Sequence, residues 1–591
     1  MVGRASLTKS TRLAAARVGV LGWVVLTGAD ALAQNVAVHV DGVFYEGAQA
    51  FVLGWACQPG NKTSVEVRIY AGAPKGAFAV AGRADFESDP GVSNACRDRE
   101  GKHRFKLALP SSMFAKGSQR KAFAEAMPPS GPPPSLGGAY KHPTTHPWVF
   151  TTASELEELA RRINVSGSYS AARFGQLAAQ IARDLAARND WNAVFTGCDA
   201  GLLQYAFSYE PQTSPIAQAL HSALNLGPDA VVPAGAAVVA SRLSLYAALA
   251  KAGAKISAGG PDPDQAAALA KRILLTWGER GFRDGQGRFL TKQNQLCDAN
   301  GGHADVAGAG LAISRGIVYS VHAQDLLMYY GALTAGEAAA LNAFHSAIFV
   351  LLLDSLNSNY EHHAWACDHY GNHSANILAG LMATARLADN QRQIEAVLFG
   401  KDPSMRVALP WIAYFDRAIY GEADLPNSCY FNSGADSNSS HLFFSTPNVA
   451  PGEIDDRFRN KGEGQGIGYP MFTLERLVNV AEILRVAGFD AYGYRGIHQQ
   501  SIEVAIGYYA CFGKAAGFGK LVSAANSRSC PNAPQYYGKI VNDVDRMAQL
   551  GAYRFPSDAA ITSVEAAAKK STSEAVTTFS TDAILFGKWR D

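Results

Sequence analysis

The residues best suited to chemistry lie in two short segments. Asn372 and His373 stand directly before an apolar run at 377–387, and Tyr469 stands before a second apolar run that starts at Phe472. An amide can donate a hydrogen bond to a carboxylate, and an imidazole can donate or take a proton. A phenol, with an ordinary pKa of about 10, can do both when a nearby cation stabilises its ionised form. Together these side chains suit the removal of a proton next to a carboxylate.

Removing such a proton is difficult, because the anion left behind carries two negative charges. A site for this reaction must neutralise the carboxylate with hydrogen-bond donors or cations. It must also supply a base, and then an acid for the leaving oxygen. In a polysaccharide that contains uronic acids, this chemistry is β-elimination, which cleaves the chain without water. Asn372, His373 and Tyr469 have the residue types that it needs.

Both segments resemble the alginate-lyase-type polysaccharide lyases, which are helical toroids that cleave acidic polysaccharides. In that family an Asn-His pair begins a helix, and a tyrosine opens a later helix of pattern Tyr-x-x-aromatic-x-Leu-x-x-Leu. Four residues match that pattern here: Tyr469, Phe472, Leu474 and Leu477. The resemblance covers roughly residues 300–500. It implies that Asn372 neutralises the substrate carboxylate, that His373 assists or takes the proton, and that Tyr469 acts as base, acid or both.

Further substrate contacts are expected near these segments. In the family, an arginine seven residues before the tyrosine activates it, but this chain has Gly462 there. Arg459 or Lys461 is proposed to take its place. Arg315 belongs to a third similar segment, which is expected beside the substrate groove. The expected substrate-binding residues are Arg315, Arg459, Lys461, Gln465, His303 and Trp365.

The run Glu361-His362-His363-Ala364-Trp365-Ala366-Cys367-Asp368-His369 is dense in potential metal ligands. Its spacing does not match H-E-x-x-H, and Cys367 is expected to be oxidised in an exported protein. No metal ligands are therefore assigned, although a bound zinc or calcium ion stays open as an alternative. No organic cofactor is implied.

Two other functions remain open. A glycoside hydrolase needs a pair of carboxylates, and four candidates exist: Asp305, Asp368, Asp455 and Asp456. A non-catalytic glycan-binding protein would use aromatic side chains of the N-terminal region, where Tyr45, Phe51 and Trp55 are available. An exposed aromatic strip would indicate glycan binding, whereas a buried Trp55 beside a disulfide would be structural.

The first 33 residues have the features of a signal peptide. Basic residues precede the short apolar stretch 18–27, and Ala31-Leu32-Ala33 fits a cleavage site. These residues contain four of the 53 Lys and Arg and one of the 51 Asp and Glu, which leaves 49 basic and 50 acidic side chains. A periplasmic or extracellular location is expected. The bulk charge gives no support for a polyanion partner, so no nucleic-acid partner is expected and any site for an acidic substrate must be a local cluster of charge. No later apolar run is expected to span a membrane. The sequence indicates no oligomeric state.

Eight cysteines remain after the predicted cleavage. An even count in an exported protein favours disulfides. Pairing in sequence order is the simplest arrangement, although the sequence does not fix the connectivity. Cys57 and Cys96 form the most strongly expected pair, because both lie in one small predicted domain.

The chain is expected to contain a small β domain, a linker and a large helical domain. Residues 36–126 carry strand patterns separated by turn residues, which predicts a β-sandwich. The Pro-rich region 127–145 is expected to be a stiff linker. Helical periodicity from 146 to 552, together with the resemblance, predicts an incomplete α/α toroid. The tail 553–591 is unassigned.

The helical region shows one predicted start and a series of apolar repeats. Thr152 and Glu155 form a capping-box pattern at the predicted start of its first helix. Spacing of i, i+3 and i+4 then predicts helices at 171–188, 234–252, 264–277, 316–333, 336–356, 374–387, 472–487 and 502–512.

Overall fold

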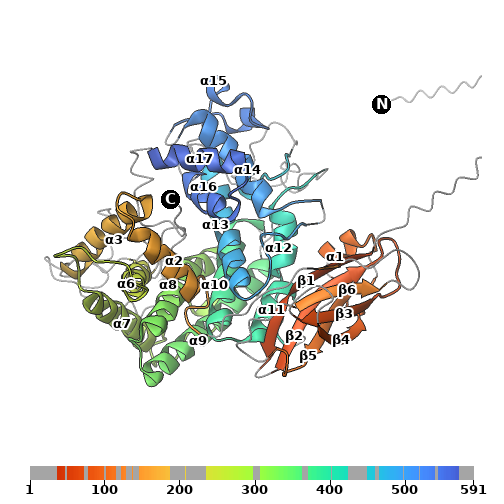
Figure 1. Ribbon diagram of the computed structural model, residues 1–591, viewed down its shortest axis with the longest axis horizontal. Coiled ribbons are helices and arrows are strands. Elements are labelled where there is room, and N and C mark those ends of the chain that lie inside the picture. The colour runs from red at the N-terminus through yellow and green to blue at the C-terminus, as the bar shows by residue number, and fades with distance from the viewer. Residues whose placement is uncertain are drawn as a thin grey trace, which may run out of the picture.

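Figure 1 shows a computed structural model of the chain, in which a small β domain stands beside a larger helical body. The structure describes residues 36–46, 49–71, 77–88, 90–98, 101–114, 122–127, 136–137, 145–186, 207, 235–296, 306–362, 370–400, 402, 404–422, 449–458, 465–496, 498–517, 520–538 and 544–570. The fold is mainly helical with two antiparallel sheets near the N-terminus, as the sequence predicted.

The β domain is a sandwich of two sheets. One sheet has the order β1-β2-β5 and the other β4-β3-β6-β7. The strands are β1 (Ala37–Glu46), β2 (Gln49–Cys57), β3 (Glu66–Ala71), β4 (Ala77–Arg83), β5 (Arg104–Leu109), β6 (Ala122–Met127) and β7 (Leu136–Gly137). Side chains alternate along β3, with Val67 and Ile69 buried between the sheets and Arg68 and Tyr70 facing outward. A short helix, α1 (Pro90–Ala95), precedes β5.

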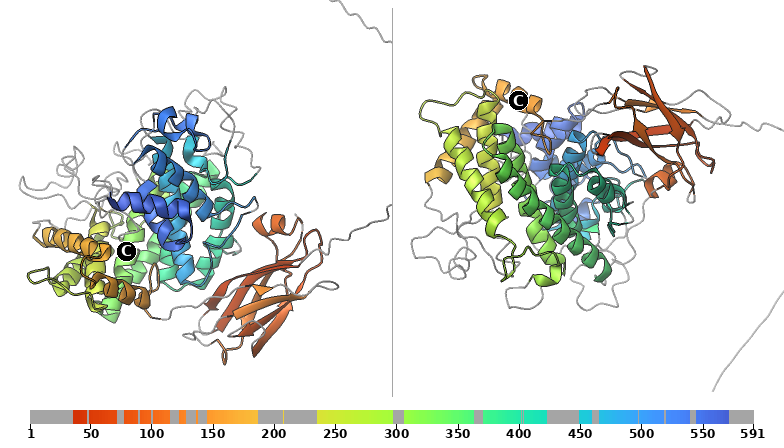
Figure 2. Two further views of the ribbon diagram at one scale, coloured as in Figure 1. Left: turned by 45° about the horizontal axis from the view of Figure 1, so that its top comes forward. Right: turned by 90° about the horizontal axis from the view of Figure 1, so that it is seen from below.

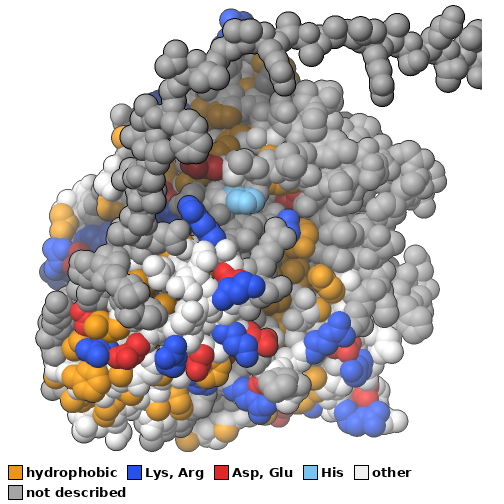
Figure 3. All heavy atoms as spheres, turned by 90° about the vertical axis from the view of Figure 1, so that its right-hand side faces the viewer, with side chains coloured by type: hydrophobic (Ala, Val, Ile, Leu, Met, Phe, Trp, Pro, Cys, Tyr) orange, Lys and Arg blue, Asp and Glu red, His pale blue; other side chains and the backbone are white. Residues whose placement is uncertain are grey.

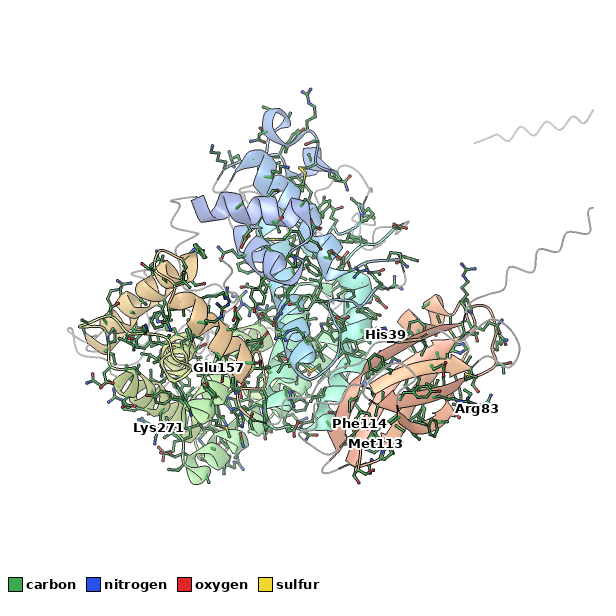
Figure 4. All side chains as sticks on the ribbon, in the orientation of Figure 1. His39, Arg83, Met113, Phe114, Glu157 and Lys271 are labelled. Carbon is green, nitrogen blue, oxygen red and sulfur yellow. A yellow bond between two sulfur atoms is a disulfide. The ribbon has the colours of Figure 1, made fainter. Side chains whose placement is uncertain are left out.

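The predicted pair Cys57–Cys96 forms a disulfide, and it explains Trp55. Cys57, Cys96 and Val92 form a small buried cluster against which Trp55 packs. The indole also stacks on the imidazole of His39, with ring centres 6.1 Å apart. His39 lies on the side of the β domain that faces the helices (Figure 4). Trp55 therefore has the structural role that the sequence left as one of two alternatives.

The β domain rests on the helical domain through β2 and β5. The guanidinium of Arg104 lies 4.2 Å from the centre of the Phe399 ring, and Lys106 forms an ion pair with Glu395 at 3.2 Å. Lys106 also lies over the ring of Phe51, so Phe51 belongs to this contact rather than to an exposed strip. The side chain of Tyr45 lies outside the described residues. Figure 3 shows the face on which the β domain lies, where Lys and Arg are interspersed with Asp and Glu.

The helical domain is a curved double row of antiparallel helices. Helices α6, α8, α10 and α13 pack side by side in that order, and α7, α9, α11 and α14 each follow and pack against one of them. Figure 2 shows this row in its right-hand view. The helices of both rows are α6 (Ala236–Lys251), α7 (Pro263–Arg280), α8 (Val306–Tyr330), α9 (Ala335–His362), α10 (Asn372–Leu387), α11 (Gln391–Phe399), α13 (Gln465–Val486) and α14 (Ile502–Ala516).

The inner helices are buried on nearly all sides because other helices cover them, and most of their side chains are apolar. Every residue of α6 from Ala236 to Leu249 is buried, and α10 is buried along nearly its whole length. Two glycines allow α8 and α10 to approach closely. A side chain at Gly310 of α8 would lie 2.6 Å from Ile377 of α10, and one at Gly380 of α10 would lie 3.2 Å from Ser314 of α8. This packing is typical of the incomplete α/α toroid that the sequence predicted.

The first helices of the domain are anchored by two carboxylates. Thr152 and Glu155 form the predicted capping box at the start of α2 (Ala153–Ile163), which α3 (Tyr169–Ala186) follows. Glu155 also forms an ion pair with Arg485 of α13 at 3.0 Å. In the entering chain, His146 Nδ1 lies 2.5 Å from a carboxylate oxygen of Asp325 on α8, and the same carboxylate accepts the backbone N–H of Trp148 at 2.9 Å.

The C-terminal part adds more helices than the sequence analysis assigned. It contains α12 (Trp411–Ala418), α15 (Ala524–Ser527), α16 (Val544–Arg554), α17 (Ala559–Lys570) and the 3-10 helices η6 (Asp455–Phe458) and η7 (Ala533–Tyr536). Helix α17 lies beyond residue 552 and packs on α14 and α16. Buried Glu482 of α13 accepts hydrogen bonds from Arg554 of α16 and from Tyr492. A second disulfide, Cys511–Cys530, agrees with pairing in sequence order. The other four cysteines lie outside the described residues.

Helix α9 is longer and more apolar than the sequence analysis expected of any segment after residue 33. Among the described residues, Ala335–Tyr360 is the one stretch long and apolar enough to cross a membrane. The expectation that no such run exists was therefore wrong. Half of its most apolar window is buried against the rest of the protein, where the helix packs on α7, α8 and α10. A core helix of a soluble domain has these same properties.

Candidate active site

Helix α10 begins at Asn372, next to a carboxylate from a distant part of the chain. Its N-cap, Gly371, has no side chain to accept a hydrogen bond from the first turn. Instead, Asp456 of η6 accepts the backbone N–H of Asn372 through Oδ2 at 2.9 Å. On the other side, the hydroxyl of Tyr414 donates to the carbonyl oxygens of Tyr370 and Gly371 at 2.9 and 3.0 Å. The main chain that carries the Asn-His pair is thus held from two sides.

The side chain of Asn372 is buried but not fully hydrogen-bonded. Asn372 is 1% exposed, and its Oδ1 accepts no hydrogen bond from the described residues. One turn later, Asn376 donates through Nδ2 to the carbonyl of Asn372 at 2.7 Å, and its own Oδ1 is likewise unsatisfied within the described part of the chain. His373 is partly exposed. Buried polar atoms without partners are rare in folded proteins. The start of α10 thus has two buried amide oxygens that can accept further hydrogen bonds.

Tyr469 lies on α13, the inner helix beside α10. Its side chain is partly exposed, and its ring meets the ring of Phe472 edge to face at 6.5 Å between centres. The sequence analysis expected Tyr469 to open this helix, but α13 begins at Gln465. The backbone is therefore already helical before Tyr469, and Pro470 lies inside the helix.

Arg315 of α8 reaches the same aromatic ring. Its guanidinium carbon lies 5.4 Å from the centre of Phe472, within the range of a cation–π interaction. Arg315 and Tyr469 thus both contact Phe472, although they come from different helices. Among the cations expected to bind the substrate, Arg315, Arg459 and Lys461, Arg315 is the one whose side chain the structure describes.

Asp456 connects the two motif-bearing helices. Besides the N–H of Asn372, its Oδ2 accepts the hydroxyl of Thr473 on α13 at 2.8 Å. Thr473 lies four residues after Tyr469, so both side chains are on one face of the helix. Asn372, His373, Tyr469 and Arg315 therefore belong to one region of the fold, on three adjacent inner helices.

Burial raises the pKa of two tyrosines near the start of α10. Burial, with the negative charge of Asp456, raises the pKa of Tyr414 well above its ordinary value. Burial also raises the pKa of Tyr370. Both phenols therefore stay protonated near neutral pH, and Tyr414 acts as a hydrogen-bond donor to the main chain.

The two described carboxylates that were considered for a hydrolase bind groups of the protein itself. Asp455 and Asp456 are at most 1% exposed. Asp455 accepts a hydrogen bond from Tyr420, and Asp456 holds α10 and α13. A hydrolytic pair must reach the glycosidic bond from both sides, and these two side chains face protein groups. Asp305 and Asp368 lie outside the described residues.

Several other predicted residues also lie outside the described part of the chain. These are His303, Trp365, Arg459 and Lys461, and for Gln465 only the helical backbone is described. The ligand-rich run from Glu361 to His369 is described only to His362, and there without side chains. Within the described residues, no group of three or more His, Cys, Asp or Glu side chains gathers to hold a metal ion.

Two cavities lined by described residues lie on outer helices. One, of about 460 Å³, lies between α7 and the α8–α9 turn and includes Lys271 and Tyr330. The other, of about 530 Å³, lies between α7 and α9 and includes Arg283 and Phe289. Figure 4 labels Lys271 on α7, far from the β domain. Neither cavity includes a residue of the two motifs.

The sequence analysis missed the functions of three residues at this site. Asp456 was considered only as half of a hydrolytic pair, Thr473 was not singled out, and Phe472 was treated as a pattern position. Asp456 bonds Asn372 across 84 residues and Thr473 across 17, and no local spacing reveals either contact. The sequence offered one signal for this contact, a threonine one helical turn after Tyr469.

Comparisons with known proteins give a limited result. No protein-family model matches the chain, and none of the curated proteins matches its sequence. One solved structure that is similar is an alginate lyase from Bacteroides ovatus, with 13% sequence identity and a TM-score of 0.43. The similarity covers 75% of this chain and 99% of the other.

Proposed function

We propose that the protein is a polysaccharide lyase that cleaves a uronic-acid-containing glycan by β-elimination. The observation that carries the proposal is the shared position of the two motifs. Asp456 binds the start of the helix with Asn372 and His373, and it also binds Thr473, one turn after Tyr469. An amide, an imidazole and a phenol are thereby grouped on adjacent helices, with Arg315 contacting the aromatic neighbour of the phenol.

In this proposal the amide nitrogen of Asn372, Nδ2, donates a hydrogen bond to the substrate carboxylate. Tyr469 or His373 removes the proton from C5. The electron pair forms the C4–C5 double bond, and the bond from C4 to the glycosidic oxygen breaks. The oxygen takes a proton from Tyr469, acting as acid, so that one chain end becomes saturated alcohol and the other an unsaturated uronate.

Arg315 is proposed as the cation of the site. A guanidinium near the reacting carboxylate stabilises the charge that develops in the transition state, in a region where burial strengthens the interaction. Arg459 and Lys461 remain proposed as additional cations, and His303, Trp365 and Gln465 as further contacts to the sugar chain.

The substrate class follows from the same chemistry. Elimination requires a carboxylate next to the carbon that loses a proton, so the proposed substrates are alginate, glucuronan, hyaluronan or a similar acidic polysaccharide. The two described disulfides are consistent with a periplasmic or extracellular location, and we propose that residues 1–33 direct export. The proposed reaction uses no organic cofactor and no metal ion.

The test is the ultraviolet absorbance of the protein with a panel of uronate polysaccharides, run beside a reducing-end assay. Elimination predicts that absorbance from the new double bond rises together with the number of chain ends. New reducing ends without absorbance would mean hydrolysis and would refute the proposal. No change in either signal across the panel would favour the glycan-binding alternative.

A further inference from the structure

We infer that Asp456 is a positioning residue for the reaction, which fixes the Asn372-His373 pair relative to Tyr469 without touching the substrate. This inference rests on the proposed function, because it assigns the residue by its effect on that site. Asp456 is 1% exposed, and its Oδ2 accepts hydrogen bonds from both motif-bearing helices.

On the α10 side, Asp456 replaces a missing cap. The first N–H groups of a helix have no partner within the helix, and a side chain at the N-cap normally accepts one of them. Gly371 provides no such side chain. A carboxylate at this end also interacts favourably with the positive end of the helix dipole. The charge of Asp456 is therefore well suited to hold the turn that presents Asn372 and His373.

On the α13 side, Asp456 supports a turn with weakened internal bonding. Pro470 directly follows Tyr469 inside the helix. Proline has no N–H to donate, and its ring crowds the preceding turn. The backbone around Tyr469 thus has fewer helical restraints than an ordinary turn, and the bond from Thr473 to Asp456 provides one from outside the helix.

The consequence concerns kcat more than substrate affinity. Catalytic groups must hold their geometry closely, and a displacement of about 1 Å costs on the order of a hundredfold in rate. Loss of the shared carboxylate removes the link between the start of α10 and Thr473 of α13. The side chains that are proposed to bind the substrate all remain present.

The experiment compares Asp456→Ala, Asp456→Asn and Thr473→Val in the full-length protein. We expect Asp456→Ala to lower kcat about a hundredfold with little change in KM. Asp456→Asn keeps an oxygen acceptor and should recover part of the rate. Thr473→Val removes a single hydroxyl without changing the side-chain shape, and should lower kcat about tenfold, which corresponds to one hydrogen bond. The matched control is Asp416→Ala. This change removes a buried carboxylate of α12 that accepts a hydrogen bond from the hydroxyl of Tyr494.

Amide hydrogen exchange gives a readout that does not depend on turnover. In Asp456→Ala the amide of Asn372 should exchange faster than in the wild type, whereas amides of α6 should be unchanged. If Asp456→Ala does not fold, the exchange rate and kcat of Thr473→Val decide the question. The wild-type protein separates the proposed function from the inference about Asp456. If the wild type forms no unsaturated product, the proposed function is refuted, whatever the effect of changing Asp456.

Three outcomes would overturn the inference. Normal kcat in Asp456→Ala and Thr473→Val, with the wild type active, would show that the link has no effect on the reaction. Unchanged exchange at Asn372 in Asp456→Ala would show that the carboxylate does not hold the helix start. An equal loss of kcat in Asp416→Ala would also count against it, since any buried carboxylate would then have the same effect.

Discussion

The guanidinium of Arg315 lies 5.4 Å from the centre of the Phe472 ring, and this contact places a cation of α8 next to the helix that carries Tyr469. Phe472 in turn meets the ring of Tyr469 edge to face. The family pattern predicted an aromatic residue three positions after the tyrosine but gave no reason for it. In this chain the Phe472 ring contacts both the ring of Tyr469 and the guanidinium of Arg315.

Arg315→Met should therefore lower kcat/KM by about a hundred- to a thousandfold, the range found when one charge-stabilising donor is removed from an active site. Methionine keeps much of the side-chain volume beside Phe472 but has no charge. The measurement is steady-state turnover on the best polysaccharide of the panel.

The control for that variant is Arg283→Met. Arg283 also lies over an aromatic ring, with its guanidinium 3.7 Å from the centre of Phe289, but it lines an outer cavity between α7 and α9. Its activity should stay close to that of the wild type. Equal losses in the two variants would contradict a special function for Arg315.

Gly310→Ala should destabilise the protein by about 1–3 kcal/mol, as overpacking of a full core does. An added methyl group would lie 2.6 Å from both Ile377 of α10 and Ser355 of α9. The free energy of unfolding, measured with denaturant, checks this. Gly175→Ala on exposed α3 is the matched control, because its methyl group would meet nothing within 4 Å. That variant should gain about 0.5–1 kcal/mol from helix propensity, and a loss as large as that of Gly310→Ala would contradict the packing argument.

His345 should make the protein sensitive to acid. It is fully buried on α9 beside Ser320, and burial lowers its pKa from 6.5 to about 3. Between these two values the unfolded chain binds a proton that the folded protein does not. The stability that neutral His345 preserves is thus complete above pH 6.5 and is lost as the pH falls toward 3, by at most about 1.4 kcal/mol per pH unit.

His345→Gln removes this titration and keeps a polar side chain near Ser320. The slope of unfolding free energy against pH, between about pH 6.5 and 3, should therefore be shallower in the variant than in the wild type. Identical slopes in the two proteins would mean that His345 contributes nothing to acid unfolding.

Local patterns in the sequence were enough to predict much of the scaffold. The capping box at Thr152 and Glu155 and the disulfide Cys57–Cys96 depend on residues within one element or one small domain, and both are confirmed. The start of α13 was placed too late, because the family pattern put it at Tyr469 and the apolar spacing at Phe472, whereas the helix begins at Gln465. The length of the apolar stretch in α9 was underestimated, because scattered polar residues interrupt it.

The site was harder to predict than the scaffold. Asn372, His373 and Tyr469 were selected by residue type and by resemblance, and their activity remains a prediction. The contacts of Asp456 with Asn372 and Thr473, and of Arg315 with Phe472, join residues that are distant in the sequence. No periodicity or spacing encodes such contacts, because they depend on how α8, α10 and α13 pack.

The central claim is elimination that depends on the phenol of Tyr469. The most direct measurement is ultraviolet absorbance during incubation with a uronate polysaccharide, for the wild type, Tyr469→Phe and the control Tyr330→Phe, whose hydroxyl instead donates to Asp264 on the outer helix α7. We predict a rise in absorbance with the wild type and the control, and a rate at least about a thousandfold lower with Tyr469→Phe, which corresponds to losing the proton transfer. Sustained absorbance with Tyr469→Phe, or new reducing ends without absorbance in the wild type, would contradict the account.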